Sequence, residues 1–144
     1  MTWDPGPGVV ELPDGTRLRG RGLRAGDAQG PSPQWALLLL ARQPAPAPWP
    51  SRWVGWPDFR LPRDPDDARA AFDEAHRRVA AGERVEVACA GGIGRTGTAL
   101  ACIAQLGGVP SDDAITWVRE HYHPRAIETP WQRRYARGFA RSFK

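Results

Sequence analysis

A cysteine and an arginine stand six positions apart in the segment Val87–Gly97, and three of the five residues between them are glycines. The segment follows a strand-like apolar run and precedes a helix-like one. Backbone N–H groups converge at such a turn, and the dipole of the following helix adds positive potential. Glycines let those N–H groups point inward because they carry no Cβ. The pattern therefore predicts a loop that cradles an anion.

The side chains at the two ends of this loop have complementary chemistry. Cys89 lies at the mouth of the ring of N–H groups, so its thiolate, the nucleophilic form, is favoured over the thiol. The planar guanidinium of Arg95 can bind two phosphate oxygens at once. Thr96 places a hydroxyl beside the same site, where it can donate to the sulfur as it leaves. The residues expected to bind phosphate are Ala90, Gly91, Gly92, Ile93, Gly94 and Arg95.

Two other interpretations of the loop compete with this one. Cys89 can be a buried cysteine in a tight turn, with Arg95 on the surface. A sulfur-transfer loop of the rhodanese type also surrounds a cysteine with anion-binding N–H groups. That type of loop does not need an arginine at this offset, and it does not need a separate acid.

Cys-x5-Arg with this glycine pattern is the signature of the cysteine-dependent protein tyrosine phosphatases, and Cys89–Arg95 closely resembles it. The resemblance covers Trp56 to about Phe139. It implies a small tyrosine or dual-specificity phosphatase that acts through a phosphocysteine intermediate, with no metal and no organic cofactor. It leaves residues 1–50 without a counterpart beyond their strand-like character.

The motif Trp56-Pro57-Asp58, followed by Pro62, resembles the mobile loop that carries the general acid in that family. When Cys89 attacks phosphorus, the departing oxygen must be protonated, and a protonated Asp58 can do this before serving as base for the hydrolytic water. A loop, one helix and a return strand fit the chain between them. Taken alone, the motif is an ordinary strand-ending turn, and only its pairing with Cys89 favours the acid.

A third segment, Glu128–Gln132, resembles the family segment whose glutamine positions the hydrolytic water. The alternative for Gln132 is a solvated position on a helix face. One departure from the family stands at Ala88, where a histidine usually precedes the nucleophile. Because that histidine braces the loop, we expect the Cys89 thiolate to be less strongly favoured here than is usual.

Strands and helices must position these motifs. The predicted strands are Val9–Leu12, Thr16–Leu18, the apolar run Trp35–Ala41, Arg52–Trp56 and Arg84–Ala88. The predicted helices start at Asp64, an N-cap followed by Pro65, at Thr96, at a cap formed by Ser111, and at Thr129-Pro130. Short connections between alternating strands and helices predict an α/β fold: a central, mostly parallel sheet flanked by helices, with residues 1–144 forming one domain.

Composition limits the class of protein. The chain has 144 residues, of which 41% are hydrophobic, enough for one globular core. Its two cysteines cannot form a disulfide framework, and its longest apolar run is too short to span a membrane, so we expect a cytoplasmic protein without a metal site. The net charge is +4, and all of the 20 basic residues except Lys144 are arginines interspersed with carboxylates. This pattern does not favour nucleic-acid binding.

Together these features predict a monomeric phosphatase that hydrolyses phosphotyrosine in a phosphorylated protein, with phosphoserine and phosphothreonine as further candidate substrates. In this interpretation Cys89, Arg95, Asp58, Thr96 and Gln132 are the catalytic residues. Two alternatives use the same scaffold: a non-catalytic module that recognises phosphate, and an RNA 5′-phosphatase.

Overall fold

The computed structural model describes residues 2–26 and 30–140, and within them it contains one five-stranded sheet in the order β1-β2-β5-β3-β4. The strands are β1 (Val9–Glu11), β2 (Arg17–Gly22), β3 (Trp35–Leu40), β4 (Ser51–Gly55) and β5 (Val85–Cys89). The helices are α1 (Pro65–Ala80), α2 (Gly94–Leu106), α3 (Ala114–His121) and α4 (Pro130–Gly138). β1 pairs antiparallel with β2 and the other pairs are parallel, so the predicted α/β class with a mostly parallel sheet is confirmed.

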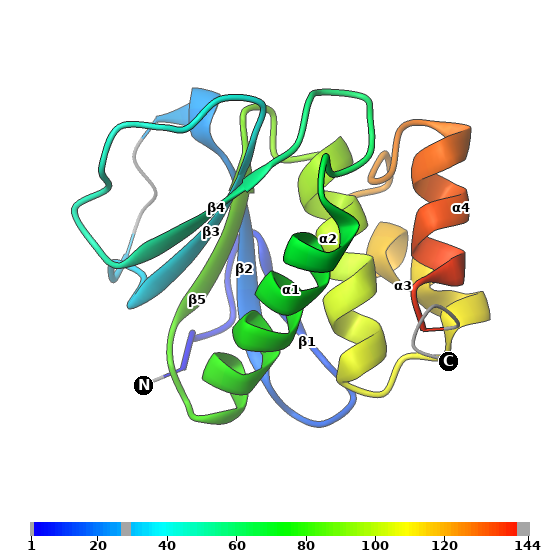
Figure 1. The fold of residues 1–144 in the computed structure, drawn as a ribbon. Helices are drawn as coiled ribbons and strands as arrows, with labels where there is room; N and C mark the ends of the chain where they lie inside the picture. Colours follow the sequence, from blue (N-terminus) through cyan, green and yellow to red (C-terminus); the bar gives the residue numbers. More distant parts are fainter. Residues whose placement is uncertain (1, 27–29, 141–144) are drawn as a thin grey trace.

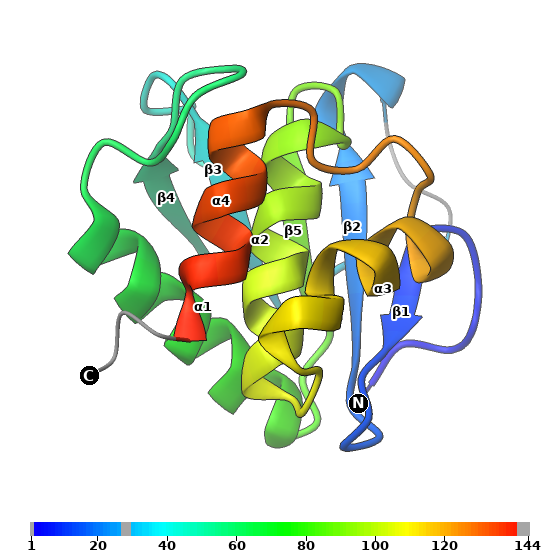
Figure 2. The same ribbon diagram turned by 90° about the vertical axis from the view of Figure 1, so that its right-hand side faces the viewer.

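All four helices lie on one face of the sheet (Figures 1 and 2). The main core forms between this face and the helices. The opposite face is covered by loop segments, and there Ala36, Leu38 and Ala88 form a second, smaller cluster with Trp49 packed against it. β3 is therefore buried on both sides, as its continuous apolar run predicted, but loops and not helices cover its second side.

Side-chain capping marks the starts of α1 and α4 but not those of α2 and α3. The side chain of Asp64 accepts hydrogen bonds from the backbone N–H groups of Asp66 and Asp67, so the predicted start of α1 is confirmed. The predicted cap at Ser111 is wrong. This residue opens a short 3-10 turn, and α3 begins only at Ala114, after a cap position whose side chain makes no capping hydrogen bond.

β2 is longer than predicted because its second half does not show the apolar alternation of a half-buried strand. It continues to Gly22, with arginines on one face and glycines on the other. Arg19 and Arg21 both bind the carboxylate of Glu86, which is fully buried on the neighbouring strand β5. A buried ion cluster thus takes the place of apolar packing, and sequence periodicity does not detect it.

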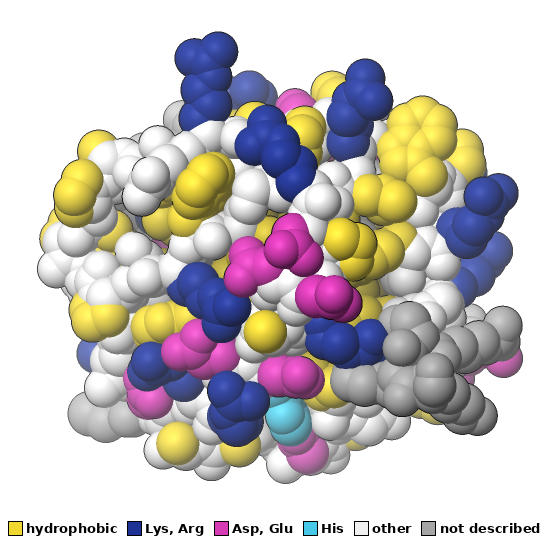
Figure 3. All heavy atoms as spheres, viewed as in Figure 1, with side chains coloured by type: hydrophobic (Ala, Val, Ile, Leu, Met, Phe, Trp, Pro, Cys, Tyr) yellow, Lys and Arg dark blue, Asp and Glu magenta, His cyan; other side chains and the backbone are white. Residues whose placement is uncertain are grey.

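Charged side chains of both signs share the exposed face of α1. In Figure 3, acidic side chains gather over this helix with arginines among them. Arg52 binds Asp67 and Glu74, and Arg78 binds Glu74 and Glu83. On this face the arginines are neutralised locally, in keeping with the interspersed charges of the sequence.

The carboxyl end of β5 is the edge of the sheet at which three loops meet. These are the connection from β4 to α1, the turn from β5 to α2, and the segment that leads into α4 (Figure 2). They carry the three motifs singled out in the sequence. The parallel arrangement of β4 and β5 on either side of β3 delivers the first two loops to the same edge.

Candidate active site

The turn between β5 and α2 folds around the sulfur of Cys89. The backbone N–H of Gly92 donates to Cys89 Sγ at 3.1 Å, so at least one loop N–H points inward as predicted. Gly92 has a φ of +73°, and a Cβ at this position would lie 2.4 Å from the backbone nitrogen of Gly22. Only glycine fits here, because both the backbone conformation and the close approach of β2 exclude a side chain.

β2 supports the outer side of the loop, a feature that the sequence did not reveal. A Cβ on Gly22 would lie 2.6 Å from Gly91 O, so the strand and the loop touch backbone to backbone. The N–H of Arg24 donates to Ala90 O at 3.0 Å. The glycines that alternate with arginines along β2 were the available sequence signal for this packing.

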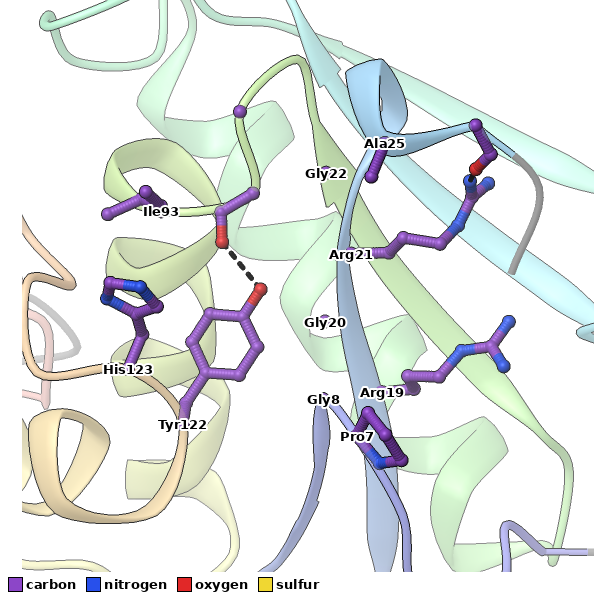
Figure 4. Close-up of a pocket in the computed structure, with 13 residues that line it drawn as sticks. Pro7, Gly8, Arg19, Gly20, Arg21, Gly22, Ala25, Ile93, Tyr122 and His123 are labelled. Atoms are coloured by element: carbon purple, nitrogen blue, oxygen red, sulfur yellow. Dashed lines mark hydrogen bonds between the residues drawn. The ribbon is translucent and has the colours of Figure 1, made fainter. Parts of the chain in front are cut away.

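Tyr122, the residue after α3, also holds the loop from outside. Its hydroxyl donates to Gly92 O at 2.5 Å, and a Cβ on Gly20 would collide with its ring (Figure 4). The carbonyl and the N–H of Gly92 are thus both engaged, the first outward to Tyr122 and the second inward to Cys89. Burial, with the nearby charges of Cys89 and Glu86, raises the pKa of Tyr122, which keeps its hydroxyl protonated as a donor.

The hollow in Figure 4 lies behind the phosphate loop. It has a volume of about 490 Å³ and is bounded by β2, by the loop at Gly91–Ile93 and by Tyr122 and His123. Arg19 and Arg21 point away from Tyr122, toward the other side of the strand. Gly91, Gly92 and Ile93 line this hollow, whereas Cys89 and Arg95 do not.

Arg95 and Asp58 come together although 37 positions separate them in the chain, from residue 58 to residue 95. Arg95 Nε lies 3.6 Å from Asp58 Oδ1, and the exposed fraction of the arginine side chain is only 5%, against 43% for the aspartate. Arg95 Nη1 also donates to Trp56 O at 3.0 Å. The arginine therefore connects the phosphate loop to the loop that carries the aspartate.

Two polar atoms of the phosphate loop are buried without a hydrogen-bond partner among residues 2–26 and 30–140: Arg95 Nε and Thr96 Oγ1. Buried polar atoms in proteins almost always have a hydrogen-bond partner, so an atom without one indicates a site that a ligand or a reaction step can use. Both atoms belong to residues that the sequence analysis assigned to the phosphate and to the leaving sulfur. A bound oxyanion can accept from the first, and the sulfur can accept from the second.

Gln132 lies at the start of α4, where it caps the helix. Its Oε1 accepts from the N–H groups of Glu128 and Thr129, and the hydroxyl of Thr129 accepts from the N–H of Gln132. Its Nε2 donates to Arg60 O at 3.1 Å, and the side chain is fully buried. The solvated alternative is therefore excluded, and the amide contacts the loop of Asp58.

Ala88, where the resemblance leads one to expect histidine, faces away from the cradle. Successive side chains of a strand alternate between the two faces of a sheet. Cys89 lies in the main core, and Ala88 packs with Ala36 and Leu38 on the opposite face.

The described residues contain neither a metal-binding group of side chains nor a helix that could span a membrane. In the part of the chain that the structure describes, no group of three or more His, Cys, Asp or Glu side chains has an arrangement able to hold a metal ion. Among the same residues, no helix combines the length and apolar character needed to cross a membrane.

Comparison with known proteins gives matches in sequence and in structure. Two uncharacterized proteins of Methanocaldococcus jannaschii are 40% and 38% identical to this chain over 87 residues, or 60% of it. These matches span 56% and 52% of the two proteins, so the chain spans about half the length of the curated relatives that it matches. No protein-family model matches the chain.

Solved structures match over nearly the whole chain. Tk-PTP in its active form has a TM-score of 0.72 at 20% identity, covering 95% of this chain and 99% of that one. Kinase associated phosphatase has a TM-score of 0.73 at 13% identity, covering 96% and 97%. Human DUSP28 has a TM-score of 0.66 at 20% identity, covering 99% of each. This chain therefore has the fold of the protein tyrosine and dual-specificity phosphatase superfamily.

Proposed function

We propose that the chain is a protein phosphatase that hydrolyses phosphotyrosine through a phosphocysteine intermediate. The observation that carries this proposal is the buried Arg95, whose Nε has no hydrogen-bond partner among the described residues while it faces Asp58 Oδ1 at 3.6 Å. A phosphate ester needs a donor for its phosphoryl oxygens, a nucleophile for its phosphorus and an acid for its leaving oxygen. A buried guanidinium next to a carboxylate, in the loop that begins with a cysteine, suits these three needs.

The first half-reaction transfers the phosphoryl group to the enzyme. Cys89 Sγ forms a bond to phosphorus as the bond from phosphorus to the tyrosyl oxygen breaks, and Asp58 gives that oxygen its proton. The loop N–H groups and Arg95 bind the phosphoryl oxygens and stabilise the charge that they carry in the transition state. The N–H of Gly92 donates to Cys89 Sγ, the atom that attacks.

The second half-reaction returns the enzyme to its starting state. A water molecule loses a proton to Asp58 and attacks phosphorus, and the bond from phosphorus to sulfur breaks. The hydroxyl of Thr96 can donate to the leaving sulfur, since it has no hydrogen-bond partner among residues 2–26 and 30–140. Gln132 remains the proposed residue for positioning the water, although its amide is engaged with neighbouring backbone groups.

The remaining proposals concern the whole protein. We take residues 1–144 as one phosphatase domain, monomeric and cytoplasmic, with phosphorylated protein as substrate and without nucleic acid as partner. The structural neighbours, which are protein tyrosine and dual-specificity phosphatases, support this substrate class. Activity toward phosphoserine or phosphothreonine belongs to the same proposal.

The test is hydrolysis of a phosphotyrosyl peptide by the purified chain. We expect turnover that orthovanadate inhibits and that the Cys89→Ser variant lacks, while that variant still binds the peptide. Cys102→Ser is the matched control, because Cys102 is fully buried in α2 and burial raises its pKa. Binding of the peptide by the wild type without turnover would support a phosphate-recognition module instead. Turnover only of RNA 5′-phosphate ends would support the RNA phosphatase.

A further inference from the structure

The loop that carries Asp58 is tied to the first turn of α4 through two consecutive carbonyl groups. Trp131 Nε1 donates to Phe59 O at 2.5 Å, and Gln132 Nε2 donates to Arg60 O at 3.1 Å. Phe59 and Arg60 are the two residues directly after Asp58. Their peptide groups are thus held on one side by α4 while Arg95 meets the aspartate on the other.

Trp131 does not belong to the hydrophobic core. Its side chain is 48% exposed, which is unusual for a large aromatic residue, and so is that of Phe59 at 51%. Phe59 also has a φ of +62°, a left-handed conformation that a residue with a Cβ adopts when its surroundings hold it there. The hydrogen bond from Trp131 to the Phe59 carbonyl is one such constraint.

On the helix side of this contact, Gln132 is held by hydrogen bonds of the capping box. Gln132 Oε1 is fixed by the N–H groups of Glu128 and Thr129 in a capping box, so its Nε2 has a defined direction. The loop side is less tightly packed. A hollow of about 490 Å³, lined by Pro57, Arg60, Leu61, Arg63 and Trp131, lies between the loop and the indole. Gln132 is thus held by the start of its own helix, whereas the loop borders open space.

We propose that Trp131 and Gln132 form a latch that holds the acid loop closed over the phosphate site, so that they act as positioning residues for Asp58. This inference rests on the proposed function and adds a second role for Gln132. The strength of the two hydrogen bonds sets the fraction of molecules in which Asp58 lies beside Arg95. The two steps in which Asp58 gives or takes a proton depend on that fraction, and kcat/KM for an ester reports the first of them.

The first experiment compares two esters that differ in their need for an acid. Phenyl phosphate releases phenolate, a basic leaving group that must be protonated. 2,4-Dinitrophenyl phosphate releases dinitrophenolate, a stable anion that needs no proton. In Trp131→Phe, which keeps a ring but loses the N–H, we expect kcat/KM for phenyl phosphate to fall about three- to tenfold. The value for the dinitrophenyl ester should change less than about twofold. Trp117→Phe, on α3 and stacked on His121, is the matched control and should change neither.

Gln132→Glu separates the latch from the helix cap. A glutamate at this position can still accept from the backbone N–H groups of the capping box, but as a carboxylate it cannot donate to Arg60 O. We expect kcat/KM for phenyl phosphate to fall at least as far as in Trp131→Phe, and the thermal midpoint to fall as well, because a carboxylate is then buried beside Arg60 O. Since Gln132 is also the residue proposed to position the water, selectivity between the two esters is judged on Trp131→Phe. Trp131→Phe made in Asp58→Asn should have no further effect on phenyl phosphate, because Trp131 acts through Asp58 alone.

The outcomes separate the two proposals. Equal losses on both esters in Trp131→Phe, or an unchanged kcat/KM for phenyl phosphate in that variant, overturn the latch and leave the proposed function standing. Additive losses in the Asp58→Asn background also overturn it. A wild-type chain that hydrolyses neither ester overturns the proposed function, and the latch with it.

Discussion

Arg19 and Arg95 are both buried, yet their charges are met in opposite ways. Arg19 donates to Glu86 Oε2 from Nε at 2.9 Å and from Nη2 at 2.5 Å, and Arg21 donates to the other carboxylate oxygen at 3.0 Å. Arg95 lies 3.6 Å from its carboxylate partner, and its Nε has no hydrogen-bond partner among the described residues. The Glu86 carboxylate thus accepts hydrogen bonds from two guanidinium groups, whereas the Arg95 guanidinium retains one N–H without an acceptor among the described residues.

The two arginines differ in whether their hydrogen bonds are complete without a bound ligand. The cluster around Glu86 joins β2 to β5 and closes its hydrogen bonds internally, so it is complete without a ligand. Arg95 is held in place by Trp56 O but keeps one N–H unsatisfied, at a cost in stability that a bound oxyanion can offset. Four substitutions test this contrast, beginning with the largest expected effect.

Arg95→Lys should affect catalysis far more than folding. Lysine keeps the charge but has no planar fork, so it cannot replace the two-oxygen contact. We expect kcat/KM for phenyl phosphate to fall about a thousandfold, as on removal of a strong oxyanion donor. The free energy of unfolding, measured in urea, should change by about 1 kcal/mol or less. A loss of stability without loss of rate would remove the contrast with Arg19.

Glu86→Ala should do the reverse. It leaves two buried guanidinium groups without their shared carboxylate, and breaking a buried ion pair in this way costs about 3–5 kcal/mol of unfolding free energy. Glu11→Ala is the matched control, because its bond to Arg17 is 57% exposed on the glutamate side and should contribute only about 0.5 kcal/mol. Urea unfolding of both variants measures the difference. Equal losses would mean that burial does not distinguish the two pairs.

Asp58→Asn tests the carboxylate that faces Arg95. Because Asp58 is 43% exposed and 3.6 Å from the guanidinium, its removal should change the unfolding free energy by less than about 0.5 kcal/mol. Turnover of phenyl phosphate should fall about a hundredfold, because the leaving oxygen loses its proton donor. Unchanged turnover of that ester would assign the acid to another residue.

Tyr122→Phe gives the smallest expected effect and tests the loop from its outer side. The variant loses the hydrogen bond to Gly92 O but keeps the ring that packs on Gly20. We expect about 1 kcal/mol of lost stability and a fall of about tenfold or less in kcat/KM. Tyr135→Phe, also largely buried but on α4, serves for comparison. An unchanged kcat/KM in Tyr122→Phe would show that the hydrogen bond to Gly92 O does not matter for turnover.

Much of the framework followed from local patterns. The cap at Asp64, the capping box at Thr129 and the glycine-rich turn after Cys89 are each specified within a few residues, so the sequence predicted where α1 and α4 begin and that a turn joins β5 to α2. The second half of β2 escaped prediction because its arginines alternate with glycines and not with apolar residues. Its burial depends on Glu86, which lies on a distant part of the chain.

The sequence by itself determined the chemistry available to this protein: a cysteine, an arginine and a glycine-rich turn at fixed spacing, because these act within one loop. The tertiary structure decided which polar groups are satisfied. It paired Arg19 with Glu86, placed Asp58 beside Arg95, and turned Gln132 toward Arg60. Such pairings join residues far apart in the chain, and they depend on the order of the strands and on burial, which local spacing does not encode.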